Sequence, residues 1–245
     1  MPVTFIQFDL ADLNSIKSAA EQFLTNAERL DVLVTNAGVL GLPPGQTKDG
    51  YEIQFGTNHL GHALLIKLLL PIMLRTAEDS TSDVRIVSLT STAYRLAPKG
   101  GISFDSLKTP QAELGGMIVS GKWVRYGQSK FANMIYAKEL AKRYPSIKSV
   151  SVHPGYVKTD MVANVSFMLA LPLLVAVPLG PGWTPVEKGP YNQIWAGTTD
   201  KSNLKNGAYY VPIAKEGSFA IARARDSVLA ERLWDWTQKE LEAFQ

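Results

Sequence analysis

The segment Asp31-Val32-Leu33-Val34-Thr35-Asn36-Ala37-Gly38 decides the fold class of this chain. Its first five residues form an apolar, β-branched run that predicts a buried strand, and Asn36-Ala37-Gly38 predicts a tight turn directly after it. Runs of the same kind follow at 84–89 and 149–153. Such strands are typical of parallel sheets that are covered on both faces.

Helical patterns alternate with these strands along the chain. Asp12 or Asn14 can cap a first helix, and Asp226 can cap a last one. The remaining predicted elements are strands at 3–8 and 208–212 and helices at 51–75 and 123–143. This alternation predicts a single α/β domain, residues 1–245, built on a doubly wound parallel sheet with helices on both faces.

The composition narrows the classes of function. The 245 residues are 46% hydrophobic, enough for a sizeable core, and the net charge of +3 without a basic run predicts no nucleic-acid partner. The absence of cysteine excludes disulfides, thiol nucleophiles and thiolate metal sites, and three histidines leave little for a metal centre. We see no secretory signal and no run of roughly 20 apolar residues. We therefore expect an intracellular, cytoplasmic protein.

The residues directly after each strand are the candidates for chemistry, because doubly wound sheets bind ligands at the carboxyl ends of their strands. Asp9 follows the first predicted strand, Asn36 the second, Ser91 the third and His153-Pro154-Gly155 the fourth. Taken singly, each is also ordinary turn chemistry. Asp9, for example, can cap a turn or accept a hydrogen bond from an amino group of a ligand.

Tyr126-Gly127-Gln128-Ser129-Lys130 lies between the third and fourth strands. On a helix, Tyr126 and Lys130 share one face because they are four residues apart. A free tyrosine has a pKa near 10 and is a poor acid–base catalyst at neutral pH, but a nearby ammonium favours the phenolate and lowers that pKa. Ser91 would then hold a carbonyl or alcohol oxygen beside the phenol. Taken alone, a tyrosine and a lysine four residues apart more often lie on the surface.

In chain order, the motifs closely resemble the short-chain dehydrogenase/reductase family over essentially the whole chain. The context after the lysine, Asn133 and Glu139-Leu140-Ala141, and the segment 102–107 are most similar to retinol-dehydrogenase-like and WW-domain-oxidoreductase-like members. The motifs that carry the resemblance are Asp9-Leu10, Asn36-Ala37-Gly38, Asn58 within a helix, Thr90-Ser91, Tyr-x-x-x-Lys at 126–130 and Pro-Gly-x-Val-x-Thr at 154–159.

The resemblance implies a Rossmann-like, NAD(P)-dependent oxidoreductase that interconverts a hydrophobic alcohol and its ketone or aldehyde. Tyr126 would be the general acid or base, Lys130 would bind the nicotinamide ribose and lower the pKa of Tyr126, and Ser91 would orient the substrate oxygen. Asn58 would hold a water in a proton relay from Lys130 to solvent. The residues implied to bind the cofactor, NADP with NAD as the alternative, are Asp9, Asn36, Ala37, Gly38, Tyr126, Lys130, Val157 and Thr159.

Three departures from the family pattern carry expectations. Thr35 replaces an asparagine, and the long interval from Ser91 to Tyr126 predicts an insertion around 111–121 near the substrate mouth. The family's opening Thr-Gly-x-x-x-Gly-x-Gly turn and its first two β-α units, roughly 60 residues, do not occur. We therefore expect an N-terminally truncated domain with an uncovered sheet face, unpaired strand edges and weak cofactor binding. The alternative function is a non-enzymatic interaction partner.

The segment 160–190 is expected to bound the substrate within this domain. Its apolar residues favour a small hydrophobic alcohol or carbonyl compound such as a retinoid, steroid, polyketide or lipid, and packing or a dimer contact explains them equally well. Contact with a membrane surface and assembly into a homo-oligomer stay open alternatives. The apolar residues are Met161, Val162, Phe167, Met168, Leu169, Leu171, Leu173, Leu174 and Val175.

Overall fold

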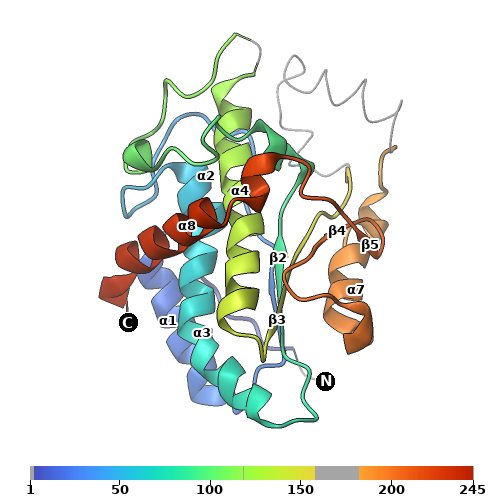
Figure 1. Cartoon of the computed structure of the whole chain (residues 1–245). Helices are drawn as coiled ribbons and strands as arrows, with labels where there is room; N and C mark the ends of the chain where they lie inside the picture. Colours follow the sequence, from blue (N-terminus) through green and yellow to red (C-terminus); the bar gives the residue numbers. More distant parts are fainter. Residues whose placement is uncertain (1–2, 118, 158–181, 245) are drawn as a thin grey trace.

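The computed structural model describes residues 3–117, 119–157 and 182–244, and its centre is a five-stranded sheet (Figure 1). The first four strands are parallel, and the last pairs antiparallel at the edge. In spatial order the strands are β1 (Val32–Thr35), β2 (Arg85–Leu89), β3 (Lys148–Val152), β4 (Tyr209–Val211) and β5 (Lys215–Glu216). The predicted α/β class and parallel sheet are confirmed.

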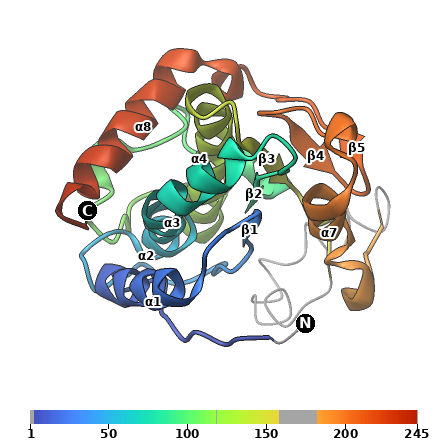
Figure 2. The ribbon, with the colours of Figure 1, turned by 90° about the horizontal axis from the view of Figure 1, so that it is seen from below.

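Helices cover both faces of this sheet, as the view from below shows (Figure 2). One face carries α1 (Leu13–Asn26), α3 (Gly61–Glu78), α4 (Gly121–Arg143) and α8 (Ser227–Glu240), and α7 (Tyr191–Thr198) lies on the other. Two short elements, α2 (Ile53–Phe55) and the π-helical turn η1 (Gly56–Leu60), lead directly into α3. Short 3₁₀ helices are η2 (Thr92–Leu96), η3 (Phe104–Ser106), η4 (Val186–Lys188), η5 (Lys201–Asn203), η6 (Ala222–Arg225) and η7 (Glu242–Phe244).

Two aspartates begin helices, as the sequence predicts. The Asp12 carboxylate accepts hydrogen bonds from the first-turn amides of α1, at 3.0 and 3.2 Å, so Asp12 rather than Asn14 is the cap. Asp226 caps α8 in the same way, at 2.9 and 3.2 Å. Each carboxylate satisfies amides that have no partner inside the helix, which fixes where the helix begins.

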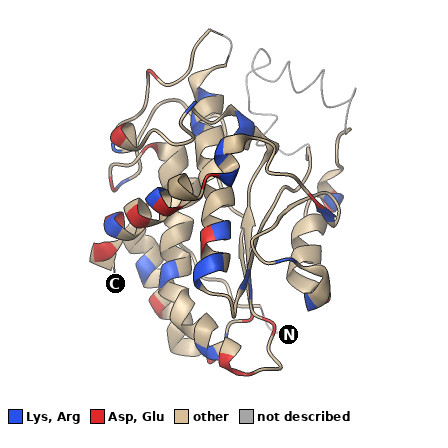
Figure 3. Cartoon of the chain, viewed as in Figure 1, with Lys and Arg blue, Asp and Glu red and all other residues tan. Residues whose placement is uncertain are grey.

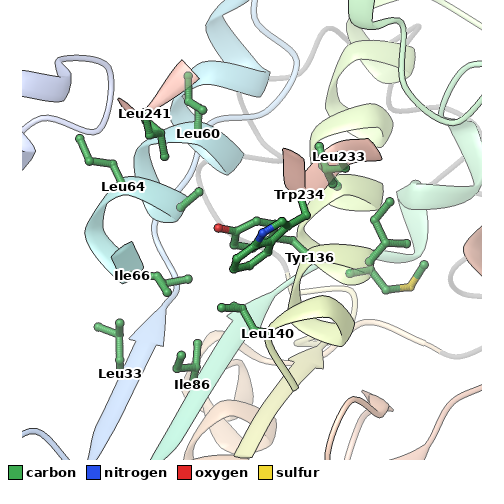
Figure 4. Close-up of a cluster of buried hydrophobic side chains, with 14 of the residues drawn as sticks. Leu33, Leu60, Leu64, Ile66, Ile86, Tyr136, Leu140, Leu233, Trp234 and Leu241 are labelled. Atoms are coloured by element: carbon green, nitrogen blue, oxygen red, sulfur yellow. The ribbon is translucent and has the colours of Figure 1, made fainter. Parts of the chain in front are cut away.

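The main hydrophobic core lies between the sheet and α3, α4 and α8 (Figure 4). At its centre Tyr136 of α4 stacks on Trp234 of α8, with ring centroids 5.1 Å apart and an interplanar angle of 20°. Leu33 and Ile86 reach this core from the strands. A smaller core beneath α7 contains Val87, Leu89, Val150, Val152, Ala196, Leu204, Ala208 and Tyr210. Because both faces of the sheet are packed, the central strands carry apolar residues on both faces.

The strand predicted at 3–8 is wrong. This segment has no regular secondary structure, and its Val3 and Phe5 side chains are 95% and 83% exposed. A strand needs a partner for its backbone groups, and no described strand lies beside this segment. Among the described strands, β1 pairs only with β2, so its other edge is unpaired within the described sheet, as expected. Val34 on β1 is 40% exposed while Leu33 and Thr35 are buried, so one face of this strand is partly uncovered.

The helical stretch Ile53–Glu78 is long and apolar enough, by length and composition alone, to cross a membrane. More than half of its most apolar window is buried, and the core helices of soluble proteins pass the same test. Here the stretch packs against α1 and α4. Figure 3 shows Lys and Arg interspersed with Asp and Glu over the helices and loops rather than gathered on one element.

The stacked pair at the centre of the core gives a stability prediction. Trp234→Ala should lower the free energy of unfolding by about 3–5 kcal/mol, because a large buried ring leaves a cavity beside Tyr136. Urea unfolding measures this loss. The matched control is Val228→Ala on the same helix, where the side chain is 74% exposed and the change should stay within about 0.5 kcal/mol. Equal losses in the two variants would contradict the packing described.

Candidate active site

The carboxyl ends of β1, β2 and β3 meet at one edge of the sheet, at the top of Figure 1. Val34 pairs with Val87 and Leu89 pairs with Val152, so the residues that leave these strands start side by side. The segments 98–117 and 119–120, which cover most of the predicted insertion, lie at this same end of the molecule (Figure 1). The register of the sheet therefore places the predicted site residues at one edge.

Asn58 is fully buried in the π-helical turn η1. Its side-chain oxygen accepts a hydrogen bond from the Val39 amide (2.7 Å), and its side-chain nitrogen donates to the Val39 carbonyl (2.9 Å). The same nitrogen donates to Ser129 Oγ at 3.0 Å. One amide thus joins the loop after β1 to α4. Single π-turns within helices often occur at functional sites.

The position of Gly38 shows why the Asn-Ala-Gly turn needs a glycine. A Cβ atom at this position would lie 2.7 Å from Asn58 Oδ1 and 3.6 Å from Lys130 Nζ. Only glycine lets the loop approach Asn58 this closely without a shift of the amide. The turn was expected to allow a ligand to approach, and the contact that it makes in this structure is with the protein's own asparagine.

The main-chain carbonyl of Asn58 is also occupied by protein groups. It accepts hydrogen bonds from His62 Nδ1 (2.9 Å) and Asn133 Nδ2 (3.0 Å). Asn133 Nδ2 lies 3.1 Å from the Leu89 carbonyl, to which Lys130 Nζ also donates, at 3.3 Å. Sequence reasoning missed His62, whose four-residue spacing from Asn58 on a helix was the available signal. The water-holding role of Asn58 stays a prediction.

Ser91 and Tyr126 come together at the end of β2. The Ser91 hydroxyl accepts a hydrogen bond from the Ala93 amide at 3.2 Å as the cap of η2, which leaves its own O–H to donate to the phenol or to a ligand. A hydrogen bond between Ser91 and the phenol lowers the pKa of Tyr126, but burial has the larger effect and raises that pKa to about 12. The phenol is therefore protonated at neutral pH, the form that can donate a proton.

Lys130 lies one helical turn after Tyr126, with Nζ 5.8 Å from the centre of the phenol ring. Its side chain is buried, and burial lowers its pKa to about 8. The net shift of the Tyr126 pKa is therefore upward, against the predicted direction, because desolvation is the largest effect on both groups. A lysine with a pKa of about 8 is still mostly protonated at pH 7 and can exchange a proton near neutrality.

A buried ion pair holds the start of α4, next to Tyr126. Arg125 Nε lies 3.3 Å from Glu52 Oε1, and both side chains are almost completely buried. The guanidinium also donates to the Gln111 and Leu42 carbonyls, each at 3.1 Å. Three segments distant in sequence thus meet at Arg125, including the predicted insertion through Gln111. Sequence reasoning missed this pair, because nothing local links Glu52 to Arg125.

The residues predicted to line the cofactor are less closely gathered. Asn36 and Ala37 are exposed at the end of β1, where Asn36 Oδ1 accepts a 3.4 Å bond from Gln193 of α7. The Asp9 carboxylate accepts the Ala11 amide at 2.8 Å in the turn before α1. Val157 forms a β-bridge with Thr184.

Thr159 and residues 160–181 of the predicted substrate segment lie outside the described residues. The residues that the structure brings together are Gly38, Asn58, Ser91, Tyr126 and Lys130.

The buried ion pair gives a second stability prediction. Arg125→Met leaves the Glu52 carboxylate buried without its counter-charge, which should cost about 3–5 kcal/mol of unfolding free energy. Adding Glu52→Gln removes the uncompensated charge, so the double variant should be more stable than Arg125→Met alone. Urea unfolding of the three chains measures this. A double variant less stable than Arg125→Met would show that charge pairing is not what Arg125 supplies.

Because Lys130 is buried, we expect its replacement by an apolar residue to stabilise the fold. Below about pH 8 the Lys130 ammonium is charged in the folded chain although it is buried away from water, which costs stability. In the unfolded chain the same ammonium stays protonated up to about pH 10.5. Lys130→Met should therefore raise the unfolding free energy by about 1–3 kcal/mol at pH 7. The gain should shrink as the pH rises from 8 towards 10.5. Asn133 keeps the Leu89 carbonyl paired in the variant.

Thermal unfolding across this pH window measures the gain. The control is Lys142→Met on the same helix, where the side chain is 62% exposed and removal of the ammonium should bring no comparable gain. If Lys130→Met is less stable than the parent chain at pH 7, desolvation does not control this lysine.

Comparison with known proteins identifies the family of this chain. A family model described as short chain dehydrogenase matches residues 1–108. An uncharacterized oxidoreductase of Schizosaccharomyces pombe is 39% identical over 98% of this chain and 70% of its own length. Human retinol dehydrogenase 14 is 34% identical over 94% of this chain and 64% of its own length.

A solved structure shows the same fold. The crystal structure of a blue fluorescent protein from a metagenomic library, in complex with NADPH, superposes with a TM-score of 0.57 at 25% identity, over 88% of this chain and 75% of that chain. The chain belongs to the short-chain dehydrogenase/reductase family of oxidoreductases, in its retinol-dehydrogenase-like branch.

Proposed function

We propose that this chain is an NAD(P)-dependent oxidoreductase that interconverts a small hydrophobic alcohol and its ketone or aldehyde through Ser91, Tyr126 and Lys130. The observation that carries the proposal is the meeting of Ser91 with the buried Tyr126 phenol, one helical turn from the buried Lys130 ammonium. A hydroxyl donor, a protonated phenol and an ammonium at one strand edge are the protein groups that carbonyl reduction uses beside a hydride donor.

Each side chain has a separate part in this chemistry. Ser91 donates a hydrogen bond to the substrate oxygen, in place of the one it makes to the phenol, and holds that oxygen beside Tyr126. Tyr126, protonated at neutral pH because burial raises its pKa to about 12, donates its proton to the oxygen that becomes the alcohol. The phenolate left behind is stabilised by the Lys130 ammonium on the same face of α4. In the oxidation direction, Tyr126 accepts the alcohol proton instead.

The described residues fit the nicotinamide half of the cofactor. Lys130 Nζ has three N–H donors, and its protein hydrogen bond is to Leu89, which leaves donors for the ribose hydroxyls. Asn36 and Ala37, exposed at the end of β1, would line the adenosine side, and Val157 would lie near the carboxamide. When bound, the cofactor supplies or accepts a hydride. We favour NADP because a solved structure of similar fold was obtained with NADPH.

The substrate class follows from the resemblance to a retinol dehydrogenase and from the apolar composition of 160–190. Of that segment the structure describes 182–190, which returns to the site through the 2.9 Å bond from the Thr184 amide to the Tyr156 carbonyl. A cytoplasmic location, a homo-oligomer and contact with a membrane surface stay predictions.

The test combines cofactor binding with one substitution. The 245-residue chain should bind NADPH saturably in a fluorescence titration and reduce acetophenone. Tyr126→Phe should keep the fold and lower kcat by at least about a hundredfold, because the proton donor is lost. The matched control is Tyr144→Phe at the other end of α4, where the same atom is removed away from the site.

Two results would contradict the proposal. Retained turnover in Tyr126→Phe would remove Tyr126 from the mechanism. A folded chain that binds neither NADPH nor NADH would instead favour the alternative function, a non-enzymatic interaction partner. Near-ultraviolet circular dichroism of each variant distinguishes loss of the fold from loss of catalytic activity.

A further inference from the structure

A second pair of hydroxyls lies beside Ser91 and has no part in the chemistry above. Thr92 is the next residue along the chain, and its Oγ1 lies 3.0 Å from the phenolic oxygen of Tyr156. Both side chains are partly exposed. We call them the Thr92–Tyr156 pair. One hydrogen is shared between the two oxygens, so the other O–H is free to donate to a further oxygen.

The sheet places this pair at the same edge as Ser91. Leu89 at the end of β2 pairs with Val152 at the end of β3, so the chain leaves the two neighbouring strands at the same level. Ser91 and Thr92 follow one strand, and Tyr156 follows the other. The Tyr156 backbone is held there by the 2.9 Å hydrogen bond from the Thr184 amide to its carbonyl. The pair is thus fixed at the edge that carries Ser91.

His153 supports Tyr156 from behind. Its ring meets the Tyr156 ring edge-on, with centroids 5.3 Å apart, and its side chain is only 4% exposed. Neither ring nitrogen has a hydrogen-bond partner among the described residues. Nearby, the buried Tyr209 hydroxyl is also unpaired within the part of the chain that the structure describes. Unpaired buried polar groups are costly, which points to a role beyond packing for this polar corner of the site.

The charge at this corner favours an electron-rich oxygen. Arg95 lies on η2, three residues after Thr92, and is exposed. Its guanidinium acts on His153, whose pKa is lowered to about 4 by burial and by this positive charge, so the imidazole is neutral. No carboxylate forms an ion pair with Arg95 among the described residues. A positive field with free hydroxyl donors attracts an oxygen lone pair rather than a hydrocarbon.

We propose that the Thr92–Tyr156 pair is a subsite for a second oxygen of the substrate, with His153 as the positioning residue for Tyr156. The inference rests on the proposed function and narrows its substrates to hydrophobic carbonyl compounds that carry a hydroxyl or carbonyl oxygen next to the reacting carbon. Ser91 holds the reacting oxygen, and the adjacent Thr92 with Tyr156 binds the second one.

The experiment compares acetophenone with its α-hydroxy derivative, with NADPH as cofactor. The measured quantity is the ratio of kcat/KM for the hydroxy ketone to kcat/KM for acetophenone, in which common effects cancel. Tyr156→Phe and Thr92→Val should each lower this ratio about tenfold, the effect of one lost hydrogen bond to substrate. Thr92→Ser keeps the hydroxyl and should keep the ratio. Tyr144→Phe is the control for loss of a remote phenol.

A readout independent of turnover is saturation-transfer NMR of the two ketones with the chain alone. The hydroxy ketone should lose signal relative to acetophenone in Tyr156→Phe and Thr92→Val, and not in Thr92→Ser. An unchanged ratio in kinetics and binding would overturn the subsite and leave the proposed function standing. A parent chain that reduces neither ketone would overturn both.

Discussion

The buried amide of Asn58 is the contact on which the rest of the site depends. It pairs with both backbone groups of Val39 and with Ser129, so one side chain ties the loop after β1 to α4. Its carbonyl binds His62 and Asn133, and Asn133 leads to the Leu89 carbonyl at the end of β2. Because Lys130 donates to that same carbonyl, the position of the ammonium relative to β1 and β2 follows from this network. Glycine at position 38 is the condition that lets the network close.

Burial sets the electrostatics of the site more than the pairing of charges does. It raises the pKa of Tyr126 to about 12 and lowers that of Lys130 to about 8, so the phenol is a proton donor and the lysine can lose a proton near neutrality. Both shifts have the same cause, the removal of water from the strand ends. The site is therefore maintained at a cost in stability, a common feature of active sites.

Much of the fold was predictable because it is encoded locally. β-branched runs predicted the strands, and Asp12 and Asp226 predicted the helix starts through their short-range hydrogen bonds. The strand at 3–8 was wrong because pairing depends on a distant partner that local pattern does not contain. For the same reason the contact of Glu52 with Arg125 escaped prediction, whereas the contact of His62 with Asn58 was missed although its four-residue spacing is part of the local pattern. Ser91, Tyr126 and Lys130 were predicted from their spacing and the family resemblance, and the structure brings them close together. The direction of the Tyr126 pKa shift could not be predicted, because it depends on how deeply the phenol is buried.

The measurement that tests the central claim most directly is isotope transfer from NADPH that carries deuterium at its transferable position. The parent chain, incubated with this cofactor and a hydrophobic ketone, should yield an alcohol with deuterium on the carbon that bears the new hydroxyl. Mass spectrometry of the product reads this without reference to rate. NADPH bound by the folded chain, with no deuterium in any ketone-derived product, would contradict an oxidoreductase site built on Ser91, Tyr126 and Lys130.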